Sequence, residues 1–289
     1  NNRDFLEAWE KFKDRTPFNI ILVEVRCKYC NSNNISKYGF YKNIQRWWCN
    51  ECKRKFSDNQ THPGTKMTLP AVNSALAMFY KGVSLKLIRQ QLEEDYNYYP
   101  SNSTILRWVR RISLQGQQSI KNHHPEVGNI WLVYESKIKI GGRQYWMLDI
   151  LDALTHYLLA SNLSYNRSLE DIKILIDSAI DRAQINPEVL ITRSVAKFQK
   201  SLEIILGADA RNIKIEPQAR EEKMKFSRFW LGMLKRRRIL MDGLKLNDMA
   251  QLVLKGWMLY YNYYLTQESL NGKTPSQAAK IEYRYAGNR

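Results

Sequence analysis

The chain has 289 residues, enough for roughly two or three domains, and its hydrophobic fraction of 44% excludes a wholly disordered protein. Its 45 lysines and arginines against 28 acidic residues give a net charge of +17, which favours a polyanionic partner, either nucleic acid or an anionic membrane surface. No apolar run is long enough to cross a membrane. The sequence begins with Asn1 and shows no signal peptide, so we expect a trimmed or processed chain.

Four cysteines form two close pairs near the N-terminus. Two residues separate Cys27 from Cys30 and Cys49 from Cys52, and 18 residues separate the pairs. Two such knuckles bring four thiolates together in a tetrahedron, and soft thiolates select zinc over magnesium or calcium. We therefore predict a structural zinc ribbon over residues 25–57, in a reducing compartment. Four unrelated buried cysteines and an iron-bearing, rubredoxin-like site are the alternatives.

The ribbon carries eight basic residues and one acid, interleaved with aromatic residues. This pattern suits contacts with phosphates and bases, although the aromatic rings could instead pack the ribbon's small core. Because consecutive strand residues face opposite ways, we expect one of Trp47 and Trp48 in the core and the other exposed. The DNA-binding candidates in this segment are Lys37, Tyr38, Lys42, Arg46 and Trp47.

Three short helical patterns follow within residues 58–115. Gly82 ends the first, and Ser84 and Ser101 are good N-caps for the second and third. The third helix has the polar groups and arginines of a recognition helix in a helix-turn-helix domain. The connection Glu93–Pro100 is longer than in the standard motif, so a generic three-helix unit is the alternative. The residues spaced to face inward are Ile105, Val109 and Ile112, and the DNA-binding candidates are Asn102, Ser103, Arg107, Arg110 and Arg111.

A linker at Gly116–Asn129 precedes a long region of strands and helices. The predicted elements are strands at Ile130–Ile140, Tyr145–Asp152 and Tyr157–Leu163, a helix at Ser168–Ala183, a strand at Val189–Thr192, a helix at Val195–Leu206 and a strand at Ile213–Ile215. This order is that of a ribonuclease-H-like domain. We therefore expect a multidomain α+β fold, with a zinc ribbon, a helical helix-turn-helix domain and a ribonuclease-H-like α/β domain.

Several phrases of the sequence resemble the DDE transposases of prokaryotic, especially archaeal, insertion sequences. The most specific is Glu268–Pro275, and the others are Ile130–Lys137, Val189–Arg193 and Trp257–Tyr264. The resemblance covers residues 25–280. It implies a DNA-reading N-terminal part, a DDE-type ribonuclease-H-like domain, binding to double-stranded DNA and a homodimer.

The residues that carry the family's activity are replaced. In the family, two aspartates and one glutamate hold two Mg²⁺ ions, and the matching positions here are Tyr134, Arg193 and Arg228. One tyrosine and two arginines oppose metal binding by Coulomb repulsion. Glu135 should point to the opposite face of its strand, and Asp149 cannot supply the missing ligands alone. We expect Tyr134, Arg193 and Arg228 of the dead site to hold a DNA phosphate as a static clamp, with neutral decay as the alternative.

A late basic stretch at residues 220–245 holds nine basic residues against three acids. In the family this region lies beside DNA, so the resemblance implies a nucleic-acid face, and a merely solvated charge run is the alternative. Its candidates are Lys235, Arg236, Arg237 and Arg238. The aromatic segment Trp257–Tyr264 should be buried, in the core or between subunits.

The sequence and its resemblance together predict a catalytically inactive, domesticated transposase. We expect it to bind double-stranded DNA, to carry zinc, to form a homodimer and to act in the cytoplasm on the chromosome, in chromatin or transcription regulation. An active DDE transposase or metal-dependent nuclease and a protein-interaction scaffold are the alternatives. The expected domains are an N-terminal helix or arm at 1–24, the ribbon at 25–57, the helix-turn-helix domain at 58–115, a linker at 116–129, the ribonuclease-H-like domain at 130–245 and a C-terminal helix and tail at 246–289.

Overall fold

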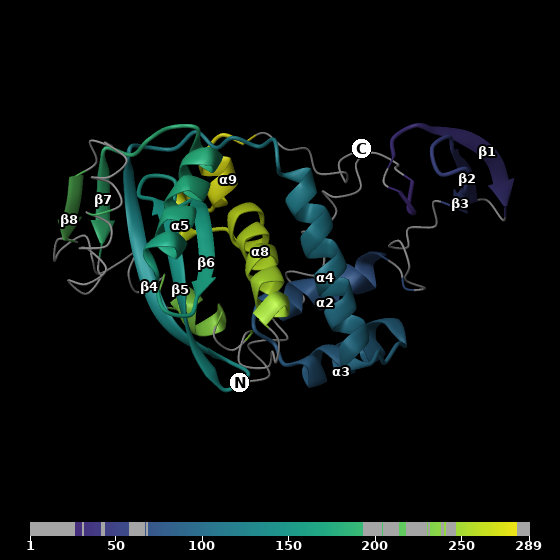
Figure 1. Ribbon diagram of the computed structural model, residues 1–289. Helices are drawn as coiled ribbons and strands as arrows, with labels where there is room; N and C mark the ends of the chain where they lie inside the picture. Colours follow the sequence, from purple (N-terminus) through teal and green to yellow (C-terminus); the bar gives the residue numbers. More distant parts are fainter. Residues whose placement is uncertain are drawn as a thin grey trace. The chain divides into compact units, whose positions relative to one another are not determined.

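The computed structural model divides the chain into two compact units, which are described separately (Figure 1). The first consists of Asn1–Phe79, Val83–Trp108 and Tyr283–Arg289, and the second of Tyr80–Gly82 and Val109–Glu282. The structure describes residues 27–30, 32–41, 44–57, 67, 69–192, 204, 214–217, 230, 232–237, 240 and 247–281. The predicted arm at 1–24 and all but one residue of the predicted helix at 195–206 lie outside these residues, as do Lys42, Arg193, Arg228 and Arg238.

The ribbon is a small antiparallel sheet in the order β1-β2-β3. Its strands are β1 (Ile35–Tyr41), β2 (Ile44–Cys49) and β3 (Lys55–Ser57). The register of β1 against β2 shifts between Lys37 and Phe40, where Gly39 has a φ of 88°, a left-handed conformation that favours glycine at a bulge. The buried core of the ribbon consists of Cys27, Cys49 and Phe56, with Ile35, Trp47 and Cys52 packed against it. Because this core is so small, we expect the cysteine cluster to contribute most to holding the ribbon together.

Three helices follow, α2 (Leu69–Tyr80), α3 (Leu85–Tyr96) and α4 (Asn102–Ser119). The predicted caps are confirmed, because the hydroxyl of Ser84 accepts from the N–H of Leu87 and that of Ser101 accepts from the N–H of Thr104. The residues predicted to face inward, Ile105, Val109 and Ile112, are all buried.

Two predicted boundaries in this region are wrong. Helix α3 continues to Tyr96 and ends at Asn97, whose φ of 49° is tolerated by asparagine, so the connection to α4 is shorter than Glu93–Pro100. Helix α4 runs through Gly116 to Ser119, into the segment predicted to be a linker. A glycine inside a helix lowers stability without ending it when tertiary packing supports the helix, and Gly116 is buried.

The second unit contains a five-stranded sheet in the order β6-β5-β4-β7-β8. Its strands are β4 (Ile130–Ile140), β5 (Arg143–Asp152), β6 (Leu158–Ser164), β7 (Val189–Thr192) and β8 (Lys214–Pro217). The first three are antiparallel, whereas β7 pairs parallel to β4 and β8 parallel to β7. A parallel pairing needs a crossover, which α5 (Leu169–Ala183) supplies between β6 and β7. This order is that of a ribonuclease-H-like fold and confirms the predicted fold of this region.

The helix α8 (Asn247–Tyr263) packs beside strand β6 (Figure 1). The Asn262 side chain accepts from the backbone N–H of Leu158 and donates to its carbonyl oxygen. The aromatic segment of this helix is buried as predicted, with Trp257 and Tyr261 at 1% and 0% exposure. After it come a short 3-10 helix, η2 (Glu268–Leu270), and α9 (Pro275–Ala278), which Thr274 caps.

Helix α8 also meets the end of α2 and the C-terminal part of α4. A Cβ atom on Gly256 would lie 2.0 Å from the hydroxyl oxygen of Tyr80 and 2.1 Å from that of Ser113, and these two hydroxyls are hydrogen-bonded at 2.7 Å. Only glycine fits at this position. Among the described residues, no helix is long and apolar enough to cross a membrane.

Candidate functional site

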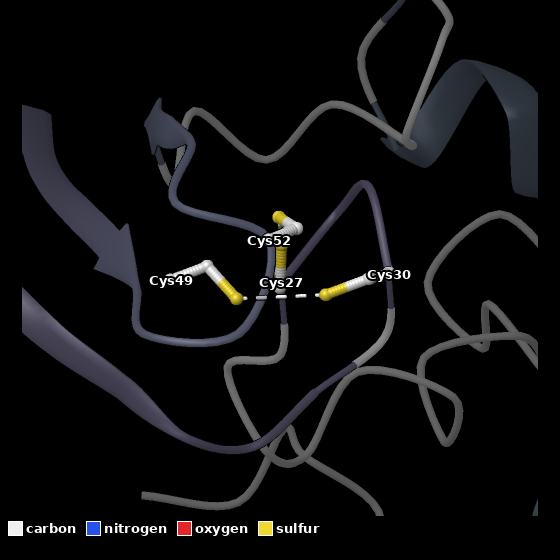
Figure 2. Close-up of side chains that lie close together, drawn as sticks. All are labelled: Cys27, Cys30, Cys49 and Cys52. Carbon is white, nitrogen blue, oxygen red and sulfur yellow. Dashed lines mark hydrogen bonds between the residues drawn. The ribbon is translucent and has the colours of Figure 1, made fainter.

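The four cysteines converge as the sequence predicts (Figure 2). The sulfur atoms of Cys27 and Cys52 are 3.5 Å apart, as are those of Cys30 and Cys49, and all four lie within 4.8 Å of one another. A tetrahedral zinc ion with Zn–S bonds of about 2.3 Å requires sulfur-to-sulfur distances of about 3.8 Å. The donor set and its spacing therefore fit a structural zinc ion.

The surroundings of the thiols favour ionisation at one of them. Burial raises the pKa of Cys27, and burial together with hydrogen bonds to the other three thiols raises the pKa of Cys52 to about 12. Burial opposes ionisation of Cys49 too, but the backbone N–H groups of Cys52 and Glu51 and the neighbouring thiols lower its pKa to about 7. The N–H of Tyr29 also donates to the Cys27 sulfur at 3.4 Å. Full ionisation of four crowded thiols requires a cation among them.

The predicted DNA contacts of the ribbon lie on two different faces of its sheet. Trp47 pairs with Phe56, packs against the cysteine core and is half-buried, and its DNA contact stays a prediction. Trp48 lies on the other face, where its ring centroid is 6.2 Å from that of Tyr38. Of the other predicted contacts that the structure describes, Lys37 and Tyr38 are exposed and Arg46 is half-buried.

Helix α4 exposes most of its predicted DNA-binding residues. Asn102 and Ser103 lie in its first turn and are exposed, and Arg107 and Arg110 are exposed further along. Ser103, Arg107 and Arg110 are four and three residues apart and therefore share one face of the helix. Arg111 is half-buried. The helix thus presents polar groups at its N-terminus and cations behind them.

The sheet face that would carry the first catalytic aspartate is filled with aromatic side chains. Tyr134 of β4 pairs directly with Asp149 of β5, so both side chains share this face. Tyr134 is only 6% exposed, and its ring centroid lies 5.8 Å from that of Trp230. The ring of Trp230 in turn lies against Trp257 and Tyr261 of α8. Tyr134 is therefore part of the core, and the expectation that it would line an open phosphate clamp is wrong.

The carboxylate of Asp149 is held by an arginine rather than left open. The guanidinium of Arg237 donates to both oxygens of Asp149, at 2.8 and 3.0 Å, and both side chains are completely buried. It also donates to the Ser161 hydroxyl at 2.7 Å, and that hydroxyl donates to Asp149. The guanidinium carbon lies 4.3 Å from the ring centroid of Trp257. Arg237 is thus the counter-charge of this buried carboxylate.

This position corrects the prediction of one exposed basic run. Lys235 and Arg236 are exposed, whereas Arg237 is buried and unable to reach DNA. Residues 232–237 are helical, Met233 and Leu234 are buried as well, and Arg237 lies four and three residues beyond them on the same helical face. That spacing was the sequence signal for its burial.

The acids on the opposite face of β4 and β5 are also engaged. Asp152 is buried and accepts from the N–H of Gly128 at 2.9 Å and from the N–H and hydroxyl of Thr155 at 2.7 Å each, so it stabilises a turn. Glu135 forms an ion pair with Arg167 at 2.8 Å. Within the described part of the chain, the cysteines form the one cluster of three or more potential metal ligands. The described residues of the face that carries Tyr134 and Asp149 do not fit a pair of Mg²⁺ ions, which require several free carboxylate oxygens.

Comparisons with known proteins return structural likenesses only. No protein-family profile and no curated protein matches the sequence. The HTLV-2 integrase catalytic core domain in complex with magnesium is matched in a dimeric form, with 14% identity, a TM-score of 0.39 and coverage of 54% of this chain and 97% of that one. The trimeric form of the same domain is matched with 15% identity, a TM-score of 0.41 and coverage of 54% of this chain and 98% of that one. A simian T-cell lymphotropic virus intasome in complex with PP2A regulatory subunit B56 gamma is matched with 14% identity and a TM-score of 0.39. The match covers 58% of this chain and 62% of that one. TM-scores of this size carry no argument, and the ribonuclease-H-like assignment of the second unit rests on its strand order and crossover.

Proposed function

We propose that this protein is a catalytically inactive, domesticated relative of the DDE transposases that binds double-stranded DNA. We further propose that it acts as a chromatin or transcription-regulatory protein rather than as an enzyme. The observation that carries the proposal is the closed sheet face, where Arg237 holds Asp149 and Tyr134 packs under Trp230.

The chemistry of this face supports the proposed loss of catalysis. A divalent ion at Asp149 would have to displace a buried guanidinium that donates to both carboxylate oxygens. It would gain a single carboxylate there, because the residue paired with Asp149 is a tyrosine. Phosphodiester cleavage with two metal ions depends on carboxylates that bridge and neutralise both ions.

The charge and the exposed cations support the DNA-binding part. The net charge of +17 provides a strong attraction to a polyanion, and α4 presents Arg107 and Arg110 beside the polar residues of its first turn. We propose that α2, α3 and α4 form a helix-turn-helix domain, with α4 as the recognition helix. The four cysteines would hold a structural zinc ion that fixes the ribbon.

The salt dependence of DNA affinity tests this proposal. Contacts from the ribbon, α4 and the pair Lys235 and Arg236 should neutralise about 5–8 phosphates, so affinity should fall by a few orders of magnitude between about 50 and about 200 mM salt. Replacing Lys235 and Arg236 by glutamine should weaken binding to all sequences alike and flatten the slope of log affinity against log salt by about 2. Fluorescence anisotropy with labelled duplexes measures both quantities. An affinity that barely changes with salt would instead favour a protein-interaction scaffold.

A further inference from the structure

The outward face of the ribbon sheet carries aromatic rings and cations together. Ser36, Trp48 and Lys55 are cross-strand partners, so their side chains lie on one face, opposite to the cysteine core. Tyr38 and Arg46 join them there, since the Tyr38 ring lies beside Trp48 and Arg46 lies over that ring. We name this surface the outer face and define it by Tyr38, Arg46, Trp48 and Lys55.

The outer face is a partly exposed platform, in which Tyr38 and Lys55 are exposed and Arg46 and Trp48 are half-buried. The ammonium nitrogen of Lys55 lies 4.0 Å, and the guanidinium carbon of Arg46 5.6 Å, from the centroid of the Tyr38 ring. Tyr38 remains 45% exposed despite these neighbours. The Tyr38 and Trp48 planes are inclined by 32°, so they form a tilted pair. The cations therefore lie within reach of the phosphates of a strand whose bases contact the rings.

Further exposed aromatic residues lie within the same ribbon. Tyr29 is 51% exposed, with the Arg54 guanidinium 5.3 Å and the Lys28 ammonium 5.9 Å from its ring centroid. Phe40, at the end of the bulge in β1, is 72% exposed. Solvent-exposed aromatic side chains beside cations indicate a ligand that has flat apolar rings and negative charges.

The paired bases of a duplex cover one another's faces and present only their edges in the grooves. Unpaired bases expose their faces and stack on aromatic side chains, while the backbone follows a basic surface. We propose that the outer face of the ribbon binds unpaired bases of single-stranded DNA, at a strand end, a bubble or a distorted site. This inference rests on the proposed DNA-binding function and adds a second form of DNA to it.

The test compares single-stranded and duplex DNA of the same sequence, with the full chain and its zinc in place. Tyr38→Leu and Trp48→Leu should each weaken single-strand binding by about fivefold to about a hundredfold, the range for loss of one stacked base. Duplex binding should weaken much less, because paired bases do not offer their faces to the rings. Tyr165→Leu, at a tyrosine of the second unit that is 66% exposed, is the matched control and should change neither. Zinc content should be equal in all four proteins, which excludes an unfolded ribbon as the cause.

A second readout locates the contact directly. A single-stranded oligonucleotide with 5-iodouracil should crosslink under light to the peptide that contains Tyr38 or Trp48, and a duplex should not. Equal losses on single strands and duplexes, or crosslinks outside the ribbon, would overturn the inference. If duplexes bind with steep salt dependence while single strands do not compete, only this inference fails. If DNA of neither form binds, the proposed function fails as well.

Discussion

Asp149 and Arg237 face each other where water is excluded, and every oxygen of the carboxylate has a donor. A buried ion pair of this kind contributes little net stability compared with a well-packed apolar pair, because both charges lose their hydration. Removing one partner is different, since the remaining charge stays buried without compensation. The pair therefore favours this packing arrangement, because any arrangement that separates Arg237 from Asp149 leaves a buried charge unpaired.

Arg237→Met should lower the free energy of unfolding of the second unit by about 3–5 kcal/mol, because Asp149 loses its counter-charge. Asp149→Leu in the same protein should recover most of this loss, since no buried charge then remains. Urea unfolding followed by circular dichroism measures all three proteins. Arg236→Met removes a neighbouring exposed arginine and serves as the control, for which no comparable loss is expected. A double variant as unstable as the single one would show that the ion pair is not the cause.

At the scale of single elements, the ribbon depends on its metal. The described ribbon has three buried core residues, two of which are the predicted zinc ligands Cys27 and Cys49. Such a core is too small to hold three strands together without a crosslink.

Cys49→Ser should therefore abolish zinc binding and unfold the ribbon while the second unit stays folded, because that unit has its own core. Elemental analysis should find about one zinc ion per chain in the parent protein and none in the variant. DNA affinity should fall in parallel. A folded ribbon in protein that contains no zinc would contradict this account.

Helix α4 should supply sequence preference. Asn102→Ala or Arg107→Ala should reduce discrimination between the preferred and a scrambled duplex by about 1–3 kcal/mol, the value of one base contact. Competition binding with the two duplexes measures the difference. Arg143→Ala, at an exposed arginine of β5 outside the proposed contacts, is the control and should leave the discrimination unchanged. If Arg107→Ala and Arg143→Ala changed the discrimination equally, α4 would not be the recognition helix.

Elements with strong local patterns were predictable, and contacts between distant segments were not. The strands β4 and β5 and the capping box of α5 follow from branched runs and from the pair Ser168 and Asp171. The end of α3 at Asn97 depends on a left-handed cap that asparagine tolerates but does not require. The pairing of Arg237 with Asp149 joins residues 88 positions apart, so no local pattern could reveal it.

For the whole molecule, the charge and the closed sheet face both favour a protein that binds DNA without cleaving it. The net charge of +17 favours a polyanionic partner, and the described residues of the sheet face offer no set of free carboxylates for catalytic metal ions. A protein of this kind should occupy DNA without changing it.

The most direct test of this account is a nicking assay on supercoiled plasmid at protein concentrations that saturate binding, with Mg²⁺ or Mn²⁺ present. The account predicts that the plasmid is fully bound and remains supercoiled. Cys49→Ser protein, purified in the same way, reveals any contaminating nuclease, because its DNA binding should be impaired. Metal-dependent nicking by the parent protein that is absent from this control and is lost in Asp149→Asn would contradict the central claim.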